Sequence, residues 1–298
     1  MAESSPRKKV VITGANGHLG QRMLQTWRDS FDLVALVRSE GAMAQLTNAT
    51  GQGVTVAVVD YADADTLRPF LDQADCLVHL SGIIKQSARN TFTQAHEDTA
   101  RAVAAAAAGS GLQGIIYLSI LGAELHSDND CLLSKARAEA ILMAAEPPCT
   151  VLQVPMVLGE GDFASLALSR KAARRWCFEF NAESYEQPVY AGDLVVVVQA
   201  HIEQGCHRQR QQLAGPEALT RRALIQRAAA VLGNSPHVIS LPVSLGYFIA
   251  AIFEMISSAP PVTRAMLGVL NHDDHLDVPD DQTDLTDLDT MLRRVISP

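Results

Sequence analysis

Short apolar runs and amphipathic segments alternate along the first half of the chain. The apolar runs contain few polar residues, which is typical of strands buried on both faces of a parallel sheet. The segments between them carry apolar residues three and four positions apart, as amphipathic helices do. The expected strands are Val10–Thr13, Leu33–Val37, Val54–Val59, Cys76–Leu80, Ile115–Ser119 and Thr150–Val154. The expected helices are His18–Arg28, Leu67–Leu71, Ala95–Ala108 and Ser134–Ala145.

This regular alternation fades after Pro155. Two later segments, Asp193–Glu203 and Thr220–Leu232, still have helical spacing, whereas the acidic stretch at 271–289 has the composition of a loop. The apolar stretch QPVYAGDLVVVV, at 187–198, has the composition of a core segment. We therefore expect the later part of the chain to return to the first core at least once.

This organisation predicts an α/β fold built on a doubly wound parallel sheet. Residues 1–156 supply the strand–helix alternation and form the first domain. Residues 157–298 form a mixed C-terminal region, with a smaller and mostly helical lobe that packs partly on the first domain.

The amino-acid composition indicates which binding partners and which cellular compartment to expect. With 33 acidic against 24 basic residues, the net charge of -9 disfavours non-specific binding to nucleic acid. The five cysteines form no CxxC pair, so we expect no metal site and a reducing, cytoplasmic compartment. The basic stretch that begins at Ser169 is expected to be a solvated helix face, with a phosphate or an anionic membrane as the alternative contact.

The stretch VVITGANGHLG, at 10–20, places three glycines between an expected strand and an expected helix. Gly14 allows a tight turn, Gly17 lets the backbone approach a pyrophosphate, and Gly20 lets the helix pack closely. The helix N-terminus adds N–H groups and a partial positive charge for the anion. In this context the GxxGxxG spacing predicts a dinucleotide-binding loop of the Rossmann type, rather than a purely structural turn. Its residues are Gly14, Asn16, Gly17, His18, Leu19 and Gly20.

The residues that end the following strands distinguish between the two nicotinamide dinucleotides. An acidic residue after the second strand would bind the ribose 2′-hydroxyl of NAD(H), but this chain has Arg38 and Ser39 there. A guanidinium suits a 2′-phosphate, so we predict NADP(H), with NAD(H) as the alternative. Further contacts with the cofactor are expected from Asp60, which can reach the adenine, and from Tyr61 next to it. Ser81 and Gly82 are expected near the pyrophosphate and ribose.

Together these features resemble the atypical short-chain dehydrogenase/reductase superfamily. Within it the chain looks most like the branch that contains the NAD(P)H-binding accessory subunit of respiratory complex I and its bacterial homologues. The stretches that carry the resemblance are GIIYLSILGA, CLLSKARAEAIL, VLQVPMVLGEGD, QPVYAGDLVVVV, QLAGPEALTRRAL and LPVSLGYFIAAIFEMIS. The resemblance implies that Pro155 and Met156 pack against the nicotinamide, and that Val157 offers its backbone to the carboxamide.

The same resemblance implies a Ser…Tyr-x-x-x-Lys site, in which the tyrosine exchanges a proton with the substrate oxygen. The serine orients the substrate, and the lysine lowers the tyrosine pKa and holds the nicotinamide ribose. The matching positions here are Ser119, Cys131 and Lys135, so a thiol replaces the phenol. A thiol differs from a phenol in acidity and reach. Tyr117 or Lys135 would have to supply the proton, unless Lys135 only binds the ribose. His96 lies near the start of a helix, where the resemblance implies a polar residue by the active site.

Two functions remain open at this point. The first is a protein that holds NADP(H) for stability, assembly or redox sensing, which the missing tyrosine favours. The second is a reductase, dehydrogenase or epimerase that acts on a lipid, a quinone or a sugar nucleotide. In that case Lys135 or a water molecule replaces the tyrosine, and the retained pair of Ser119 and Lys135 supports this alternative.

Residues 241–256 are strongly apolar and carry only one charge, on Glu254. Leu245, Phe248 and Ile252 belong to one helical stripe, and the opposite side is nearly uncharged as well. The segment is too short to span a bilayer. We therefore predict an apolar surface or lid, covered by an apolar small molecule, a membrane surface or a protein partner, with a buried helix as the alternative. This leaves open a peripheral attachment to a membrane.

Overall fold

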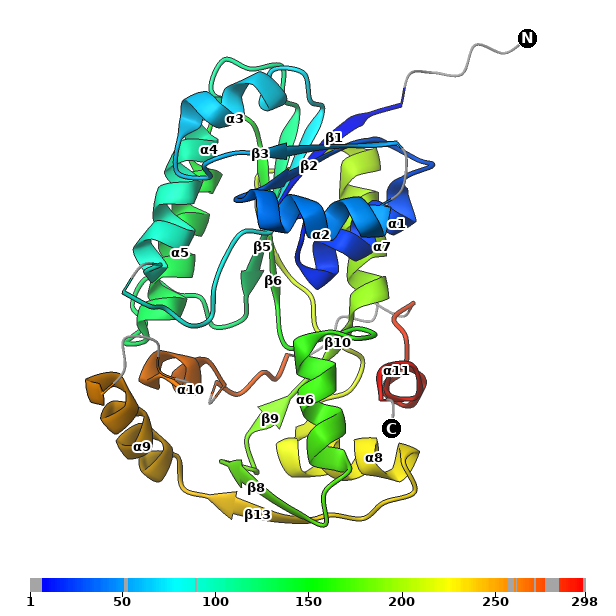
Figure 1. The fold of residues 1–298 in the computed structure, drawn as a ribbon, viewed down its shortest axis with the longest axis vertical. Helices are drawn as coiled ribbons and strands as arrows, with labels where there is room; N and C mark the ends of the chain where they lie inside the picture. Colours follow the sequence, from blue (N-terminus) through cyan, green and yellow to red (C-terminus); the bar gives the residue numbers. More distant parts are fainter. Residues whose placement is uncertain are drawn as a thin grey trace.

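A seven-stranded parallel sheet forms the centre of the computed structural model (Figure 1). The structure describes residues 7–50, 53–88, 90–256, 260, 262–270, 272–276 and 284–296. The strand order is β11-β6-β5-β4-β1-β2-β3, and every neighbouring pair is parallel. The strands are β1 (Lys9–Thr13), β2 (Asp32–Val37), β3 (Val54–Val58), β4 (Cys76–His79), β5 (Gly114–Ile120), β6 (Cys149–Val154) and β11 (Gln209–Gln212). The predicted doubly wound α/β fold is confirmed.

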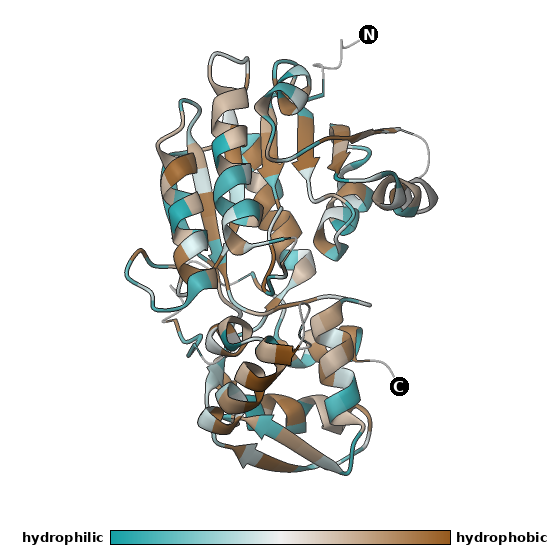
Figure 2. Cartoon of the chain, turned by 60° about the vertical axis from the view of Figure 1, so that its left-hand side comes forward, coloured by the Kyte–Doolittle hydropathy of each residue, from teal (hydrophilic) through white to brown (hydrophobic). Residues whose placement is uncertain are grey.

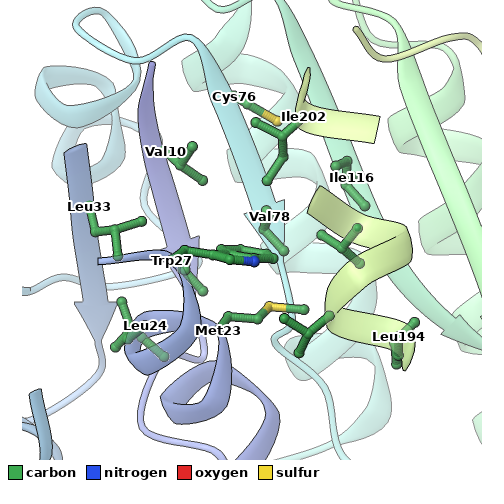
Figure 3. Packing of buried hydrophobic residues seen from close by; sticks show 14 of the residues in the cluster. Val10, Met23, Leu24, Trp27, Leu33, Cys76, Val78, Ile116, Leu194 and Ile202 are labelled. Atoms are coloured by element: carbon green, nitrogen blue, oxygen red, sulfur yellow. The ribbon is translucent and has the colours of Figure 1, made fainter. Parts of the chain in front are cut away.

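Helices cover both faces of this sheet, because consecutive strand residues point to opposite faces. On one face, Val10 and Ile12 of β1 belong to the same core as Met23 and Trp27 of α1. Figure 3 shows Val10 packed near Met23 and Trp27. On the other face, β1 contributes Val11 to a second core. The first face is covered by α1 (His18–Trp27), α2 (Glu40–Thr50) and α7 (Ala191–Gln204). The second is covered by α3 (Ala64–Leu71), α4 (Thr99–Ala107) and α5 (Asp130–Met143), and a π-helical turn, η1 (Thr93–Asp98), precedes α4.

The chain returns to the sheet after its first excursion into the second lobe. Helix α7 buries Leu194, Val195 and Val198 in the core shared with α1, and β11 then pairs with β6 at the sheet edge. The sequence of β11 is QRQQ. This strand carries no apolar signal, because it lies at an edge and is only partly covered. The hydrophobic pattern therefore did not predict it.

The small lobe combines short strand pairs with helices, in the lower half of Figure 1. The pairs are β7 (Val157–Leu158) with β10 (Val189–Tyr190), β8 (Trp176–Phe180) with β13 (His237–Leu241), and β9 (Tyr185–Glu186) with β12 (Leu219–Thr220). The helices are α6 (Phe163–Ala172), α8 (Arg221–Val231), α9 (Val243–Ile256), α10 (Arg264–Leu270) and α11 (Leu288–Val295). A third core lies mainly between α6, α8 and α11.

The acidic stretch at 271–289 is only partly described, and 271 and 277–283 lie outside the described residues. Its end enters α11, where Asp287 accepts a hydrogen bond from Thr290 N (2.9 Å) and caps the helix. Within the part of the chain that the structure describes, no helix is long and apolar enough to cross a membrane.

Candidate functional site

In the loop after β1, the backbone at the glycines lies very close to other backbone segments. Gly14 has a φ of +69°, and a Cβ there would lie 3.2 Å from the backbone of Leu80 and Ser81, just after β4. A Cβ on Gly20 would lie 2.7 Å from the backbone of Ala15, closer than real Cβ atoms come. Gly14 needs glycine for its conformation, and Gly20 needs it so that α1 can pack on the loop.

Gly17 occupies the N-cap position of α1 and is exposed. A Cβ there would meet only Gly14 O, at 3.3 Å, among the described atoms. No described side chain caps this helix end, and the first turn contains no acidic residue. The first-turn N–H groups therefore lack a side-chain partner and fit an anionic pyrophosphate. The remaining expected loop residues, Asn16, His18 and Leu19, are each at least partly exposed.

Polar residues follow β2 and β3 at the same edge of the sheet. Arg38 and Ser39 come directly after β2, and both are exposed. Ser39 Oγ accepts a hydrogen bond from Ala42 N (3.2 Å), and Asp60 Oδ1 accepts one from Ala62 N (2.9 Å). Arg38 therefore supplies a positive charge at the position where NAD(H)-binding loops carry an acid.

Tyr61 lies beneath the glycine loop. Its hydroxyl accepts a hydrogen bond from Gly14 N (2.7 Å) and donates one to Leu36 O (2.5 Å). Burial raises the pKa of Tyr61 to about 12. The side chain thus braces the loop against β2, and its expected contact with the cofactor stays a prediction.

The buried amine of Lys135 lies beside Gly82, which is exposed shortly after β4. A Cβ on Gly82 would lie 3.0 Å from Lys135 Nζ and 3.5 Å from His96 Nε2, so the amine and the imidazole flank the same glycine. Lys135 Nζ donates a hydrogen bond to Leu118 O (3.0 Å) and lies 4.6 Å from the centre of the Tyr117 ring. Burial lowers the pKa of Lys135 to about 8.

His96 in η1 contacts the backbone that follows Gly82. Its Nε2 lies 3.1 Å from Ile83 N and 3.0 Å from Ile83 O, so the tautomer decides whether it accepts or donates. Burial, and to a lesser extent the charge of Lys135, lowers the pKa of His96 to about 3. The imidazole is therefore neutral at physiological pH.

Cys131, at the position where the resemblance leads us to expect a tyrosine, has a fully buried thiol. Cys131 is in the first turn of α5, where its N–H donates to Asn129 Oδ1 (2.9 Å), and its Sγ lies 3.6 Å from Ile83 O. Burial raises the pKa of Cys131 to about 11. Tyr117 is also fully buried, its hydroxyl has no hydrogen-bond partner among the described residues, and burial raises its pKa well above the usual range. Neither group presents an exposed acidic proton.

The Ser119 hydroxyl pairs with Glu139 rather than with Lys135. Ser119 Oγ donates to Glu139 Oε1 (2.5 Å), one helical turn beyond Lys135. The fully buried Glu139 also accepts from Gln153 Nε2 (2.9 Å) and forms an ion pair with Arg210 Nε (2.8 Å). This network ties β5, β6, β11 and α5 together. Sequence reasoning missed Glu139 and Arg210, because single charged residues in a helix and a polar strand form no motif.

The remaining expected residues lie around the same edge. Ser81 and Pro155 are buried, and Val157 is half-buried in β7, where it is the partner of Val189. His79 is fully buried, and its Nδ1 lies 2.7 Å from Thr13 Oγ1, as in a satisfied core histidine.

A segment of the small lobe lies against the end of β5 and the start of α5. A Cβ on Gly122 would lie 1.8 Å from the ring of His272, so this ring rests directly on the glycine. Asn129, the N-cap of α5, donates from Nδ2 to Ala265 O in α10 (2.8 Å). The helix that carries Cys131 and Lys135 therefore begins in contact with the small lobe. Such contacts between distant segments leave no local sequence signal.

Comparisons with known proteins agree with this geometry. The sequence profile of the NAD(P)H-binding family matches residues 14–168, just over half of the chain. A ceramide reductase of Caulobacter vibrioides is 30% identical over 169 residues, which cover 56% of this chain and 52% of that protein. The mitochondrial NADH dehydrogenase (ubiquinone) 1 alpha subcomplex subunit 9 of Arabidopsis thaliana is 23% identical over 272 residues, covering 89% of this chain and 68% of that protein. The chain thus spans about half of the first relative and two thirds of the second.

Solved structures show the same fold at low sequence identity. The Bordetella bronchiseptica enzyme WbmH, in complex with NAD+, superposes with a TM-score of 0.71 at 14% identity and 97% coverage of both chains. A UDP-N-acetylglucosamine 4-epimerase from Bacillus cereus gives a TM-score of 0.64 at 19% identity, covering 79% of this chain and 85% of that chain.

We predict that Gly17→Val abolishes dinucleotide binding and leaves the sheet folded. The new side chain meets little of the protein itself, but it would occupy the space beside the first-turn N–H groups. Titration calorimetry with NADPH should show an affinity at least about tenfold weaker. Gly111→Val, at an exposed turn where a Cβ would meet only Asp72 O (3.5 Å), is the control. Unchanged affinity in Gly17→Val would show that the loop is not the phosphate site.

We predict that Lys135→Met stabilises the fold near neutral pH, by up to about 3 kcal/mol, because the buried amine has a lowered pKa. Between pH 8 and its unfolded pKa, the unfolded chain binds more protons than the folded one at this site. The penalty in wild type, and hence the advantage of the variant, therefore shrinks as pH rises through this window. Urea unfolding at several pH values measures the difference in free energy of unfolding between wild type and Lys135→Met. Lys85→Met is the control, because Lys85 is exposed. A difference in the free energy of unfolding that does not change with pH would contradict this prediction.

Proposed function

The chain belongs to the NAD(P)H-binding family, and on that premise we propose that it holds NADP(H) without turning it over rapidly. One observation carries this proposal: the phenol that drives proton transfer in related enzymes is replaced by the buried thiol of Cys131. The nearby Tyr117 is buried as well. A tightly held dinucleotide would then serve stability, assembly or redox sensing. The similarity to a mitochondrial NADH dehydrogenase subunit supports such a role.

Each part of the crevice would hold a different part of the dinucleotide. The first turn of α1 and Gly17 would bind the pyrophosphate, and Arg38 would bind the 2′-phosphate of NADP(H). Lys135, beside Gly82, would bind the nicotinamide ribose. When bound, the nicotinamide supplies hydride-transfer chemistry. The neutral His96 would hold the backbone at Ile83 without adding charge next to Lys135.

A reductase is the second candidate, and the state of Lys135 favours it. An amine whose pKa is about 8 donates and accepts protons near neutral pH, as a general acid must. The similarity to a ceramide reductase adds support for a lipid carbonyl as substrate. In this alternative Lys135 Nζ would give its proton to the substrate oxygen, after leaving its hydrogen bond with Leu118 O.

We predict that the protein binds NADPH more tightly than NADH, and that Arg38→Ala removes most of the difference. A charge-assisted contact to the 2′-phosphate should contribute roughly 1.5–3 kcal/mol. Titration calorimetry with both cofactors measures this, and Arg28→Ala, another exposed arginine, is the matched control. Equal affinities for NADPH and NADH in wild type would refute the assignment.

We predict that bound NADPH survives incubation with stoichiometric carbonyl compounds, including a long-chain ketone, an aldehyde and a quinone. The nicotinamide absorbance should stay constant over many minutes, because the Cys131 thiol and the Tyr117 phenol are both buried. Rapid oxidation that is lost in Lys135→Met but kept in Lys85→Met would instead establish the reductase. The same assay with Gly17→Val, which should not bind the cofactor, shows how much of any oxidation depends on NADPH bound to the protein.

A further inference from the structure

Helix α9 has an apolar face that is exposed at the surface. Within this helix only Gly246 and Ala250 are buried, whereas the side chain of Phe248 is 65% exposed and that of Met255 is 86% exposed. The spacing of three and four residues places the exposed side chains on one face. They are Leu245, Phe248, Ile249, Ile252, Met255 and Ile256. The prediction of an apolar surface rather than a core helix is therefore confirmed for this face.

The neighbouring strand pair extends this surface. In β8, Trp176 is 52% exposed and Phe178 is 61% exposed, and Ile239 of β13 is the register partner of Phe178. A Cβ on Gly246 would lie 3.2 Å from Phe180, so α9 packs directly against the end of β8. Figure 2 shows the strongly hydrophobic α9 in the lower lobe with these strands. We call Trp176, Phe178, Ile239 and the six exposed α9 side chains the apolar belt.

Basic residues border the apolar belt in a chain that is otherwise acidic. Arg174 and Arg175 are exposed immediately before β8, although the net charge of the chain is -9. The acidic residues nearby are paired: Glu254 of α9 with Arg264 Nε (2.8 Å), and Glu179 of β8 with Lys171 Nζ (2.5 Å). The surface around the belt is therefore complementary to negative charge.

We propose that the apolar belt docks on a membrane surface that carries anionic lipids. The 14 residues of α9 extend roughly 21 Å, short of the roughly 30 Å hydrocarbon core, so the helix would lie in the plane of the interface. Trp176, next to Arg175, has the amphipathic ring that favours this depth.

The chemistry of the exposed α9 side chains favours a lipid bilayer over a protein partner. Specific protein interfaces carry about one hydrogen bond per 100–200 Å². The exposed α9 side chains, apart from Ser244, offer no hydrogen-bonding group, and an acyl-chain boundary needs none. This inference requires neither cofactor binding nor turnover, so it stands or falls separately from the proposed function.

Flotation of the full chain with vesicles tests the proposal. We expect binding to vesicles of phosphatidylcholine mixed with phosphatidylglycerol, and weaker binding to phosphatidylcholine alone. Phe248→Asp and Ile252→Asp should each reduce the partition coefficient at least about tenfold. Val196→Asp is the matched control, because Val196 is also 65% exposed but lies on α7. Arg174→Glu combined with Arg175→Glu should remove the preference for the anionic lipid.

Tryptophan fluorescence gives an independent readout. The chain has two tryptophans, and Trp27 is fully buried, so a blue shift on adding vesicles reports on Trp176. The shift should disappear in Trp176→Phe. Far-UV circular dichroism and thermal unfolding, measured for each variant, show whether the fold is intact.

Three results would overturn the proposal. The first is that folded wild type fails to bind anionic vesicles. The second is that Phe248→Asp, still folded by circular dichroism, floats as well as Val196→Asp. The third is a concentration-dependent dimer, broken by Phe248→Asp, in a chain that binds no vesicles; this would assign the belt to a second copy.

Discussion

Close contact between backbone segments around residues 14–20 is the constraint on which the rest of the crevice depends. α1 can begin directly after β1 because Gly20 leaves its backbone free to touch that of Ala15. Gly14, in a left-handed conformation, brings the loop against Leu80 and Ser81 after β4. Tyr61 fixes the loop from below through a hydrogen bond to Gly14 N. The outcome is a helix N-terminus that no side chain caps among the described residues, and such an end fits a pyrophosphate.

The other side of the crevice is organised by two buried charged residues on one helix. Lys135 and Glu139 are one turn apart on α5. Glu139 is compensated by Ser119, Gln153 and Arg210, so it ties strands together. Lys135 has a backbone carbonyl and an aromatic ring as neighbours, and its lowered pKa records the cost of burial. This costly burial of the amine supports the proposed role of Lys135 in binding or proton transfer.

The small lobe is connected to this site through α10. Asn129 at the start of α5 contacts Ala265, and a Cβ on Gly268 would lie 3.5 Å from Tyr247 Oη of α9. The apolar belt and the helix that carries Lys135 are thus separated by one short helix. If the belt lies on a membrane, the crevice lies near the lipid surface, which would suit either a membrane-associated cofactor holder or an enzyme for an apolar carbonyl.

The sequence alone determined the parallel sheet, the glycine loop and the apolar character of 241–256. These features are local: period, glycine spacing and residue type depend on neighbours within a few positions. The predicted membership of an NAD(P)H-binding family is confirmed by the family match over residues 14–168. The places of the individual site residues around the cofactor stay predictions.

Only the tertiary structure decided which groups meet. It paired Ser119 with Glu139, placed His96 and Lys135 at Gly82, and set Tyr61 beneath the loop. It also added β11, a polar edge strand, to the sheet. The sequence did not indicate which face of α9 is exposed, because both faces are apolar. Gly246 and Ala250 became the buried face because small residues let α9 pack closely against Phe180 and Leu267, leaving the larger side chains in solvent.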